Sequence, residues 1–453
     1  MATQPLPTNT PTTTLKRALG LRDLLLYGII IVQPTAPMPS FGVVSAEARG
    51  HVVTAILIAM VAMLFTAISY GRMARAYPSA GSAFTYVSRE LHPSLGYVTG
   101  WSMAMDYILN PLICTIWCAK AAGNFAPEIP YFAWAIFFAA LFTMLNLRGI
   151  ETSARINAAL AAAMAVVIAI FLVVALRYLI HFPPQGVHAF WKPFYDPQTF
   201  SPSLVFRGTS IAVLTYIGFD GISTLSEEVH NPRRNVLLAT VLTCLVTGVL
   251  AVLEVYPAQL IWPASRPFPD VDTAFVHVAG QAGGPLLFAL VNFILLVATI
   301  GSGMGSQLGA ARLLYGMGKS EALPKRFFGA LSTRTRIPHK NVVLVGVIAL
   351  AGAFTLTYQL GAEMLNFGAL IAFMGVNAAA FVRYYLREDE KRMTNFFPPI
   401  LGFLTCAFIF TNLGPRAKIV GSIWMAAGIA YGAIKTRGFQ SRLIQFEVPA
   451  DAS

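Results

Sequence analysis

Residues 215–224 read "TYIGFDGIST" and lie inside a long apolar run. Asp220 stands in the middle of this run, and Gly218 and Gly221 lie on either side of the Phe219–Asp220 pair. A charged group is costly at membrane depth, and glycine weakens a helix. The stretch therefore predicts a buried helix that is interrupted for a functional reason.

The composition indicates a polytopic α-helical membrane protein. Of 453 residues, 56% are hydrophobic and only 11% are charged, whereas a soluble domain has about 25% charged residues. Apolar stretches of roughly 20 residues recur along the chain, and each can cross a ~30 Å hydrocarbon core. All the cysteines fall in apolar runs, so we expect small core residues and no disulfides or metal ligands: Cys114, Cys118, Cys244 and Cys406.

We expect a single twelve-helix domain over residues 19–436, between a disordered tail at 1–18 and a second tail at 437–453. With the N-terminus inside, 24 of the 32 Lys and Arg residues fall in cytoplasmic segments, which places both termini in the cytoplasm. The net charge of +12 therefore reflects membrane topology, and no basic patch with interleaved aromatics indicates nucleic acid. The expected spans lie near 22–46, 52–71, 95–120, 131–148, 156–180, 204–225, 236–261, 284–315, 341–358, 362–387, 396–413 and 417–436.

Two segments between spans predict short helices. Residues 74–91 follow span 2 on the inner side, and residues 270–280, which begin with acidic caps, follow span 7 on the outer side. A five-span offset with opposite sidedness predicts an inverted repeat. The first repeat would cover about 20–180 and the second about 204–387, and two extra helices would follow at about 396–436.

A second interruption lies in span 1, where residues 29–42 read "IIIVQPTAPMPSFG". Pro34, Pro37 and Pro39 cannot all continue one helix, because each lacks a backbone donor. The two interruptions occupy matching places in the two repeats. Unwound backbone at membrane depth is tolerated only where it is buried in protein or lines a cavity. The pair therefore predicts a substrate site near the midplane, where freed N–H groups bind a carboxylate and freed C=O groups bind an ammonium.

Three acidic residues lie well within spans: Asp106, Asp220 and Glu254. Asp106 lies near the middle of span 3, with Asn110 one turn away on the same face. Two carboxylates at one site favour a cationic substrate group or carry a coupling proton. Asp220 can instead be a gate or a partner for a helix end. Glu254 lies toward the outer end of span 7, where we expect it to reach water.

The remaining motifs indicate no enzyme. All seven histidines lie in loops or at helix ends, and no His-Glu-x-x-His, Gly-x-Ser-x-Gly or phosphate-binding loop is present. We expect no cofactor and no metal. Ser302 and Ser306 share one face of span 8, where they either contact a coupling ion or allow close helix packing.

The chain resembles the amino acid–polyamine–organocation superfamily of secondary transporters over roughly residues 16–436. Its pattern is most similar to bacterial putrescine importers, which have a similar "GFD" in span 6 and a similar Asp after "GW" in span 3. The likeness rests on "FTAISYGRMARAYPSAGSAFTYVSRELHPSLGYVTGW" (65–101), "YIGFDGISTLSEEVHNPRRN" (216–235), "RLLYGMGKSEALPKRF" (312–327) and "PHKNVV" (338–343).

The resemblance implies the five-plus-five fold with broken helices 1 and 6, and a substrate surrounded by spans 1, 3, 6, 8 and 10. Phe219 would be an aromatic lid over the ligand. The chain departs from the family at "QPTAP", where many members have a Gly-Ser/Thr-Gly run, and at Asp220, where many have Glu. It also has Met164 where some proton-coupled members have Lys. By position, the implied contacts are Val32, Gln33, Thr35 and Ala36 within 32–37, and Tyr216, Gly218, Phe219 and Asp220.

We expect a secondary active transporter of small amines, polyamines such as putrescine, or amino acids, which works in the cell membrane by alternating access. A proton is the expected coupling ion, because no sodium ligand set is visible. A neutral amino-acid carrier or an amino acid/amine exchanger is the alternative within this class. A channel or a non-transporting receptor is the alternative from another class. The expected partners are the substrate, the proton and the lipid bilayer, and the sequence does not specify an oligomeric state.

Overall fold

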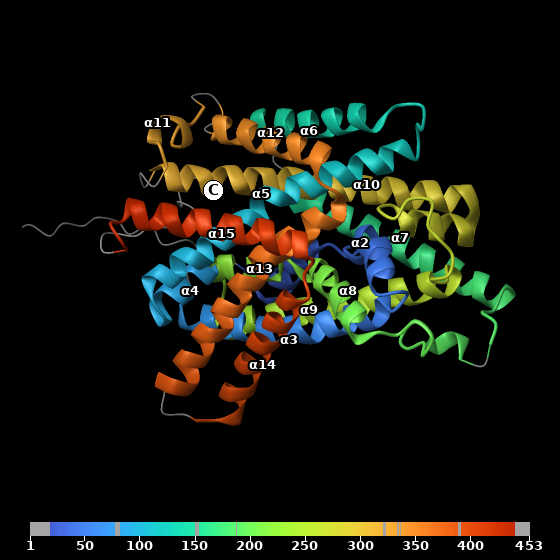
Figure 1. Cartoon of the computed structure of the whole chain (residues 1–453), viewed down its shortest axis with the longest axis horizontal. Coiled ribbons are helices and arrows are strands. Elements are labelled where there is room, and N and C mark those ends of the chain that lie inside the picture. The colour runs from blue at the N-terminus through green and yellow to red at the C-terminus, as the bar shows by residue number, and fades with distance from the viewer. Residues whose placement is uncertain are drawn as a thin grey trace, which may run out of the picture.

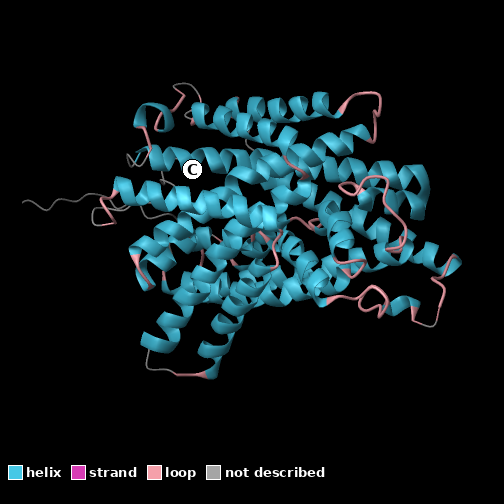
Figure 2. Ribbon diagram, viewed as in Figure 1, coloured by secondary structure: helices cyan, strands magenta, loops and turns pink. Residues whose placement is uncertain are grey.

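Helices that run roughly along one long axis make up the computed structural model of the chain (Figure 1). The structure describes residues 19–77, 82–149, 154–186, 188–319, 323–332, 335, 337–387 and 391–439. The expected tail at 1–18 and nearly all of the one at 437–453 lie outside these residues. Figure 2 shows helices and loops but no strand in the described part, where the only pairing of strand type is an isolated bridge between Leu19 and Val229.

The α-helices of the first half are α1 (Leu21–Val32), α2 (Pro37–Glu47), α3 (Val52–Ala76), α4 (Ser82–Glu90), α5 (Pro93–Gly123), α6 (Tyr131–Leu147) and α7 (Ala154–His181). Those of the second half are α8 (Pro202–Ala212), α9 (Pro232–Ile261), α10 (Ala274–Lys319), α11 (Lys325–Phe328), α12 (His339–Thr355), α13 (Tyr358–Phe381), α14 (Met393–Thr411) and α15 (Pro415–Lys435). Three 3₁₀ segments, η1 (Ala189–Trp191), η2 (Val213–Tyr216) and η3 (Phe219–Glu228), and a π-helical turn, η4 (Val382–Arg387), complete them.

By length and apolar composition, seven of the described helices can cross a membrane, or eight if the bent pair of α1 and α2 is one span. The shorter helices α6 and α12 are also apolar, and they lie beside one another at one edge of the bundle (Figure 1). The chain is therefore a polytopic helical membrane protein, as its composition predicts.

The interruption expected in span 1 is confirmed. Helix α1 ends at Val32, Gln33 has a φ of 67°, and α2 begins at Pro37 with its axis bent by 53° from that of α1. Pro37 occupies the first position of α2 and Pro39 its first turn, where a backbone donor has no partner within the helix. The prolines thus stop one helix and start the next.

The interruption expected in span 6 is also confirmed, but the chain beyond it differs from an ordinary helix. Helix α8 ends at Ala212, η2 tightens the next turn, and Gly218 has a φ of 117°. Residues Phe219–Glu228 then form a 3₁₀ helix. Hydroxyl groups favour this tight winding, because Ser223 donates to the carbonyl of Asp220 at 2.6 Å and Thr224 to that of Gly221 at 2.7 Å, both three residues back.

Both expected short helices are present. Helix α4 begins at Ser82. Of the segment at 270–280, residues 274–280 form the first part of α10, which is separated from the rest of the helix by Gly284, with a φ of 71°, and by Pro285. Span 8 therefore begins at this kink, close to the residue 284 expected for it.

Gly218 and Gly221 allow a matched test of the span 6 interruption. Because a side chain at φ 117° is strained, and a Cβ at Gly218 would lie 2.8 Å from Ile31 Cγ2, we expect Gly218→Ala to cost about 1–3 kcal/mol of stability. Gly221→Ala is the control, because its nearest neighbour would lie 3.6 Å away and its φ is not positive.

Thermal unfolding of the two purified variants, followed by size-exclusion chromatography after heating, measures the difference. The expected result is a lower midpoint for Gly218→Ala than for Gly221→Ala. Equal midpoints would contradict the need for glycine at position 218.

Candidate functional site

The two interruptions meet in the middle of the bundle. Gly218 packs against the last turn of α1, so that a Cβ at this position would lie 2.8 Å from Ile31 Cγ2 and 3.5 Å from Val32 Cγ2. The segment η3 packs on both α1 and α9. The ends of two broken helices, which are about 185 residues apart in the sequence, therefore share one location, as expected for a site built from interrupted helices.

Two partly buried acids lie near this location. The carboxylates of Asp106, on α5, and Asp220, on η3, lie close enough to interact electrostatically with each other and with the hydroxyl groups of Tyr70 and Tyr107. The structure thus brings together the two acids that the sequence places in different spans. Because like charges repel, a cation that neutralises either acid would be favoured.

Asp220 also interacts with its own unwound backbone. The backbone of Gly218, Asp220 and Gly221 lies beside its carboxylate, and the Gly221 N–H donates to the Gly218 carbonyl at 3.0 Å. Other N–H groups at an interrupted helix lack partners within the helix, and a nearby carboxylate stabilises them. The arrangement fits the role of Asp220 as a partner for a helix end, while its charge still acts on Asp106.

An aromatic cluster adjoins the acids. The ring of Phe219 is fully buried, with ring centroids 5.6 Å from Tyr70 on α3 and 5.5 Å from Phe373 on α13. The Tyr70 hydroxyl is buried and has no hydrogen-bond partner among the described residues. The sequence interpretation found Phe219 but missed Tyr70 and Phe373, because nothing separates them from other core aromatics until the helices are placed.

The span 1 linker is tied to other helices by its side chains. Gln33 Nε2 donates to the Ala298 carbonyl of α10 at 3.1 Å, and Thr35 Oγ1 contacts Met164 Sδ of α7 at 3.3 Å. Met164, which the resemblance aligns with a lysine of some proton-coupled members, therefore lies at the break. Val32 is buried and Ala36 lies in the linker turn. At these two positions a ligand would therefore meet backbone groups and not polar side chains.

Other expected residues lie outside this cluster. The Tyr216 hydroxyl donates to the Ile56 carbonyl of α3 at 3.0 Å and is buried there. Asn110 accepts from Cys114 at 3.2 Å, and Ser306 donates to the Ser302 carbonyl of its own helix at 2.8 Å. Next to these serines, a Cβ at Gly303 would lie 3.0 Å from Cys114 Cβ. This small-residue face packs α10 closely on α5.

Comparison with known proteins gives the chain a family. The amino acid permease family model matches residues 32–437, which include both interruptions and all the acids described above.

The chain belongs to the amino acid permease family. It is 33% identical over 450 residues to the low-affinity putrescine importer PlaP of Escherichia coli (strain K12), with 97% of this chain and 98% of that protein covered. It is 28% identical over 451 residues to the branched-chain amino acid permease BcaP of Lactococcus lactis, with 91% and 93% covered. The chain is thus a membrane transporter of this family, as the motifs of the sequence indicate.

One expectation for this permease is wrong. Glu254 does not reach water: it is fully buried, and neither carboxyl oxygen has a hydrogen-bond partner among the described residues. The position of Glu254 near the outer end of α9 suggested exposure. The residues around it on this helix are buried, however: Thr247, Ala251, Val255 and Ala258. The neighbouring helices cover this face of the permease.

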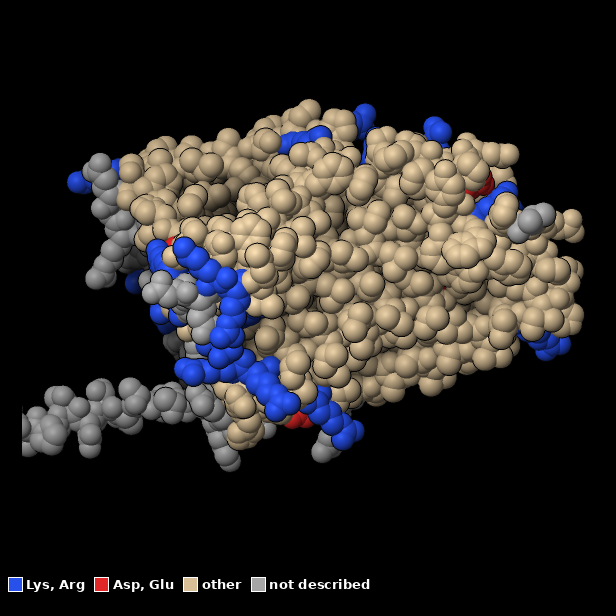
Figure 3. Space-filling view, turned by 90° about the horizontal axis from the view of Figure 1, so that it is seen from below, with Lys and Arg blue, Asp and Glu red and all other residues tan. Residues whose placement is uncertain are grey.

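The charges of the permease are unevenly distributed. Figure 3 shows Lys and Arg gathered at one end of the bundle, its left end in that view, and sparse along the sides. We call this the basic end. The opposite end, which we call the distal end, holds the end of α2 at Glu47, the loop from Trp262 to Thr273 and the turn between α12 and α13.

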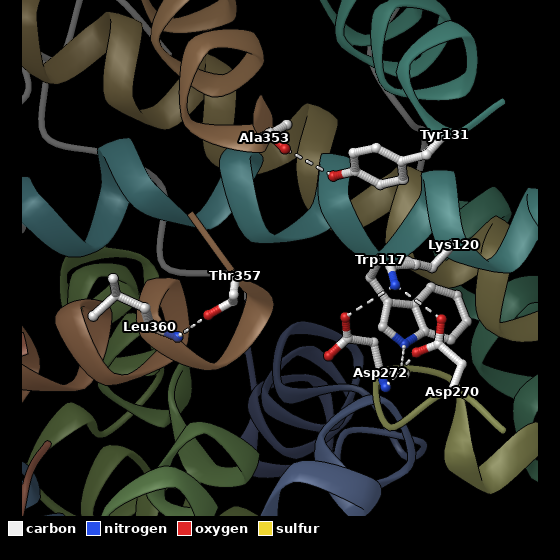
Figure 4. Close-up of polar contacts among 8 residues, drawn as sticks. All are labelled: Trp117, Lys120, Tyr131, Asp270, Asp272, Ala353, Thr357 and Leu360. Carbon is white, nitrogen blue, oxygen red and sulfur yellow. Dashed lines mark hydrogen bonds and ion pairs between the residues drawn. The ribbon is translucent and has the colours of Figure 1, made fainter. Parts of the chain in front are cut away.

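The loop between α9 and α10 closes over the distal end (Figure 4). Lys120, on α5, pairs with Asp270 at 2.9 Å and Asp272 at 3.8 Å, and Trp117 Nε1 donates to the Asp272 carbonyl at 2.8 Å. On its other side the loop packs on α2, where Val271 meets Gly42 and Phe268 contacts Phe41 edge to face. We call the contacts of Lys120 and Trp117 with this loop the α5 latch.

Asp272 makes the α5 latch sensitive to pH. Burial, followed by the nearby Asp270 charge, raises the pKa of Asp272 to about 6, while Lys120 lowers it. If the loop swings away, the carboxyl group is hydrated and returns toward its ordinary pKa of about 3.9. The latched form therefore binds the proton more tightly, so protonation favours it, and this advantage is lost as the pH rises through about 6.

We predict that opening of the distal end is about tenfold rarer at pH 5 than at pH 7.5. Ser45→Cys, a buried position on α2 one turn from Gly42, reports opening through its rate of alkylation, measured by mass spectrometry on purified protein. Because thiol reactivity itself depends on pH, the rates are compared with those of Ser45→Cys combined with Asp272→Asn. The pH effect should be smaller by about tenfold in the double variant. The same pH effect in both proteins would show that Asp272 does not control the latch.

Proposed function

We propose that the chain is a proton-coupled importer of small primary amines, with diamines such as putrescine as its main substrates. The observation that carries this proposal is the pair of carboxylates, Asp106 and Asp220, at the meeting point of the two broken helices. The 33% identity with PlaP, a protein named as a low-affinity putrescine importer, supports the same substrate class.

The geometry gives each group a role. A substrate ammonium would form an ion pair with the Asp106 carboxylate and donate hydrogen bonds to the carbonyl groups freed at the end of α1. Phe219, Tyr70 and Phe373 would present ring faces to the alkyl chain and the cation. The Tyr70 hydroxyl, which lacks a partner within the described residues, would bond the substrate nitrogen.

The proposed topology has twelve spans. It adds α5 and the broken span of α8, η2 and η3 to the apolar helices, and it relates α1–α7 to α8–α13 by an inverted repeat. The basic end would face the cytoplasm, with both termini, and the distal end would face outward, in keeping with the charge distribution in Figure 3. Alternating access would then require the α5 latch to open.

For coupling, the proposal assigns the proton to buried carboxyl groups. Glu254 is a buried acid without a hydrogen-bond partner among the described residues, and an unpaired charge there would be costly. Asp106 is the second candidate, because it lies where the substrate charge would arrive. Met164 excludes a lysine at the position next to Thr35.

The alternative is an amino-acid carrier or an amino acid/amine exchanger. The relationship to BcaP, a protein named as a branched-chain amino acid permease, favours it, as does the backbone that surrounds the Asp220 carboxylate. In that case the broken helices would bind an α-carboxylate and an α-amine together. A channel would show flux that does not saturate, and a receptor would show none.

Uptake of labelled putrescine into proteoliposomes with an imposed pH gradient tests the proposal. We predict saturable uptake, driven by inward protons and competed by diamines. Asp106→Asn should abolish both uptake and putrescine exchange while the protein stays folded, because it removes a charge that the substrate ammonium needs. Normal transport by this variant would remove Asp106 from the site. No putrescine uptake, with counterflow of α-amino acids instead, would favour the alternative.

Glu254→Gln separates the coupling role from the substrate site. Glutamine keeps the shape of a protonated glutamic acid, so we predict that this variant still exchanges putrescine across the membrane but no longer accumulates it in response to a pH gradient. The two variants are matched, since each removes one buried carboxyl group. Undiminished accumulation by Glu254→Gln would place the coupling proton elsewhere.

A further inference from the structure

A cavity of about 410 Å³ opens at the distal end, between the ends of α2, α8 and α13 and the start of α15. Four charged side chains line it: Glu47 on α2, Arg207 on α8, Glu363 on α13 and Arg416 on α15. Its volume lies within the range of small-molecule sites. It is distinct from the candidate transport site, because Glu363 and Phe373 on the same helix are separated by about 15 Å.

The two carboxylates of this cavity are arranged around a single nitrogen. Gln359 Nε2 donates to Glu47 Oε1 at 2.8 Å and to Glu363 Oε1 at 3.1 Å. The amide thus uses both of its hydrogens on two carboxylates. A primary ammonium has three donors and a full charge, so it would satisfy the same pair better than a neutral amide does.

Glu363 is built into the fold. It is only 3% exposed, and its carboxylate lies against Gly414. Gly414 lies so close to this carboxylate that any side chain there would collide with it. The Gln359 amide that bonds this carboxylate is neutral, and the nearby Arg207 is already paired with Glu47. A cationic ligand would therefore stabilise the buried carboxylate further.

The guanidinium groups decide which ligand fits. Arg207 Nε is already paired with Glu47 Oε2 at 2.6 Å. Arg416 lies exposed at the start of α15 and forms no ion pair with a carboxylate of the described residues. The four charges sum to zero, so a dication such as putrescine gains little here, whereas a ligand with both an ammonium and an anionic group matches the cavity.

We infer that this cavity binds a small zwitterion, with its ammonium between Glu47 and Glu363 in place of the Gln359 amide and its anionic group on Arg416. The inference goes beyond the proposed transport function, since the ligand would occupy α2, α8 and α13 at once. Helices α2 and α8 belong to the two broken spans, and α13 is the helix that carries Phe373. Binding would therefore hold the distal ends of these helices together.

Two sources have this chemistry: a free α-amino acid and the head group of phosphatidylethanolamine. The apolar surfaces of α14 and α15 beside the cavity, with Phe408, Ile419 and Ile423 exposed, bring a bilayer near its rim. The test must therefore separate a soluble ligand from a lipid.

A fluorine label at Thr355→Cys reports on the cavity directly. Thr355 lines it and is exposed, whereas all four native cysteines are buried, so a trifluoromethyl thiol reagent labels position 355 selectively. In detergent, we expect glycine and glycerophosphoethanolamine to shift the ¹⁹F signal saturably. Putrescine and acetate, which each have only one of the two charged groups, should not. A saturable response to putrescine, or no response to either zwitterion, would overturn the inference.

Variants identify the residues. Arg416→Gln and Glu363→Gln should each weaken zwitterion binding by about tenfold or more, because each removes a charge-assisted hydrogen bond. Lys435→Gln, at the other end of α15, is the matched control and should bind as the parent does. Arg416 is exposed, so its variant folds even if Glu363→Gln does not. Full binding by Arg416→Gln would overturn the proposed orientation of the ligand.

Nanodiscs distinguish the two sources. If phosphatidylethanolamine, added to phosphatidylglycerol discs, shifts the signal and removes the response to glycine, the zwitterion in the membrane is the lipid. If it does neither, the site takes a soluble zwitterion. Because the readout is binding and not transport, a protein that responds to glycine but takes up no putrescine would keep this site and refute the transport proposal. A protein that takes up putrescine but does not respond to glycine would keep the transport proposal and refute this site.

Discussion

The requirement that every backbone polar group at membrane depth has a partner governs this molecule. Two helices are broken in the middle of the bundle, and a broken helix leaves N–H and C=O groups that lipid cannot satisfy. The chain brings the two breaks together, so that Gly218 lies against the last turn of α1, and the Asp220 carboxylate lies beside the backbone of its own break. The remaining free groups and the second acid, Asp106, make this location a site for a polar ligand in an otherwise apolar core.

The sequence predicted the parts of this arrangement that depend on local rules. Proline at 34, 37 and 39 rules out one continuous helix, and the glycines beside a charged Asp220 weaken another, so both breaks could be placed within a few residues. The acids could be placed at similar depth because span lengths fix depth. The sequence could not predict the partners that only packing supplies: Tyr70 and Phe373 around Phe219, or the fate of Glu254, which lies near a helix end but is covered by neighbouring helices. The 3₁₀ winding of η3 is only partly predictable from the sequence. Ser223 and Thr224 indicate it only once the left-handed backbone conformation of Gly218 is known.

The distal end is held together by ionic and hydrogen-bonded contacts between helices. The loop between α9 and α10 is tied to α5 by Lys120 and Trp117 and packs on α2 through Gly42, so it bridges a continuous helix and a broken one. Glu47, at the end of the same broken span, is bonded to Arg207 of the other broken span and to Gln359 of α13. Movement of either half-helix must break charged or hydrogen-bonded contacts at this end. The ion pairs of the distal end thus lie where these helices would have to separate.

The most direct test of the account is an experimental structure of the protein with bound putrescine. The account predicts density for the diamine where α1 and η3 meet, with one nitrogen within hydrogen-bond distance of Asp106 and the alkyl chain against Phe219 and Tyr70. Density for the diamine elsewhere, with Asp106 and Asp220 bonded only to protein groups, would contradict the claim that the two broken helices and their acids form the substrate site.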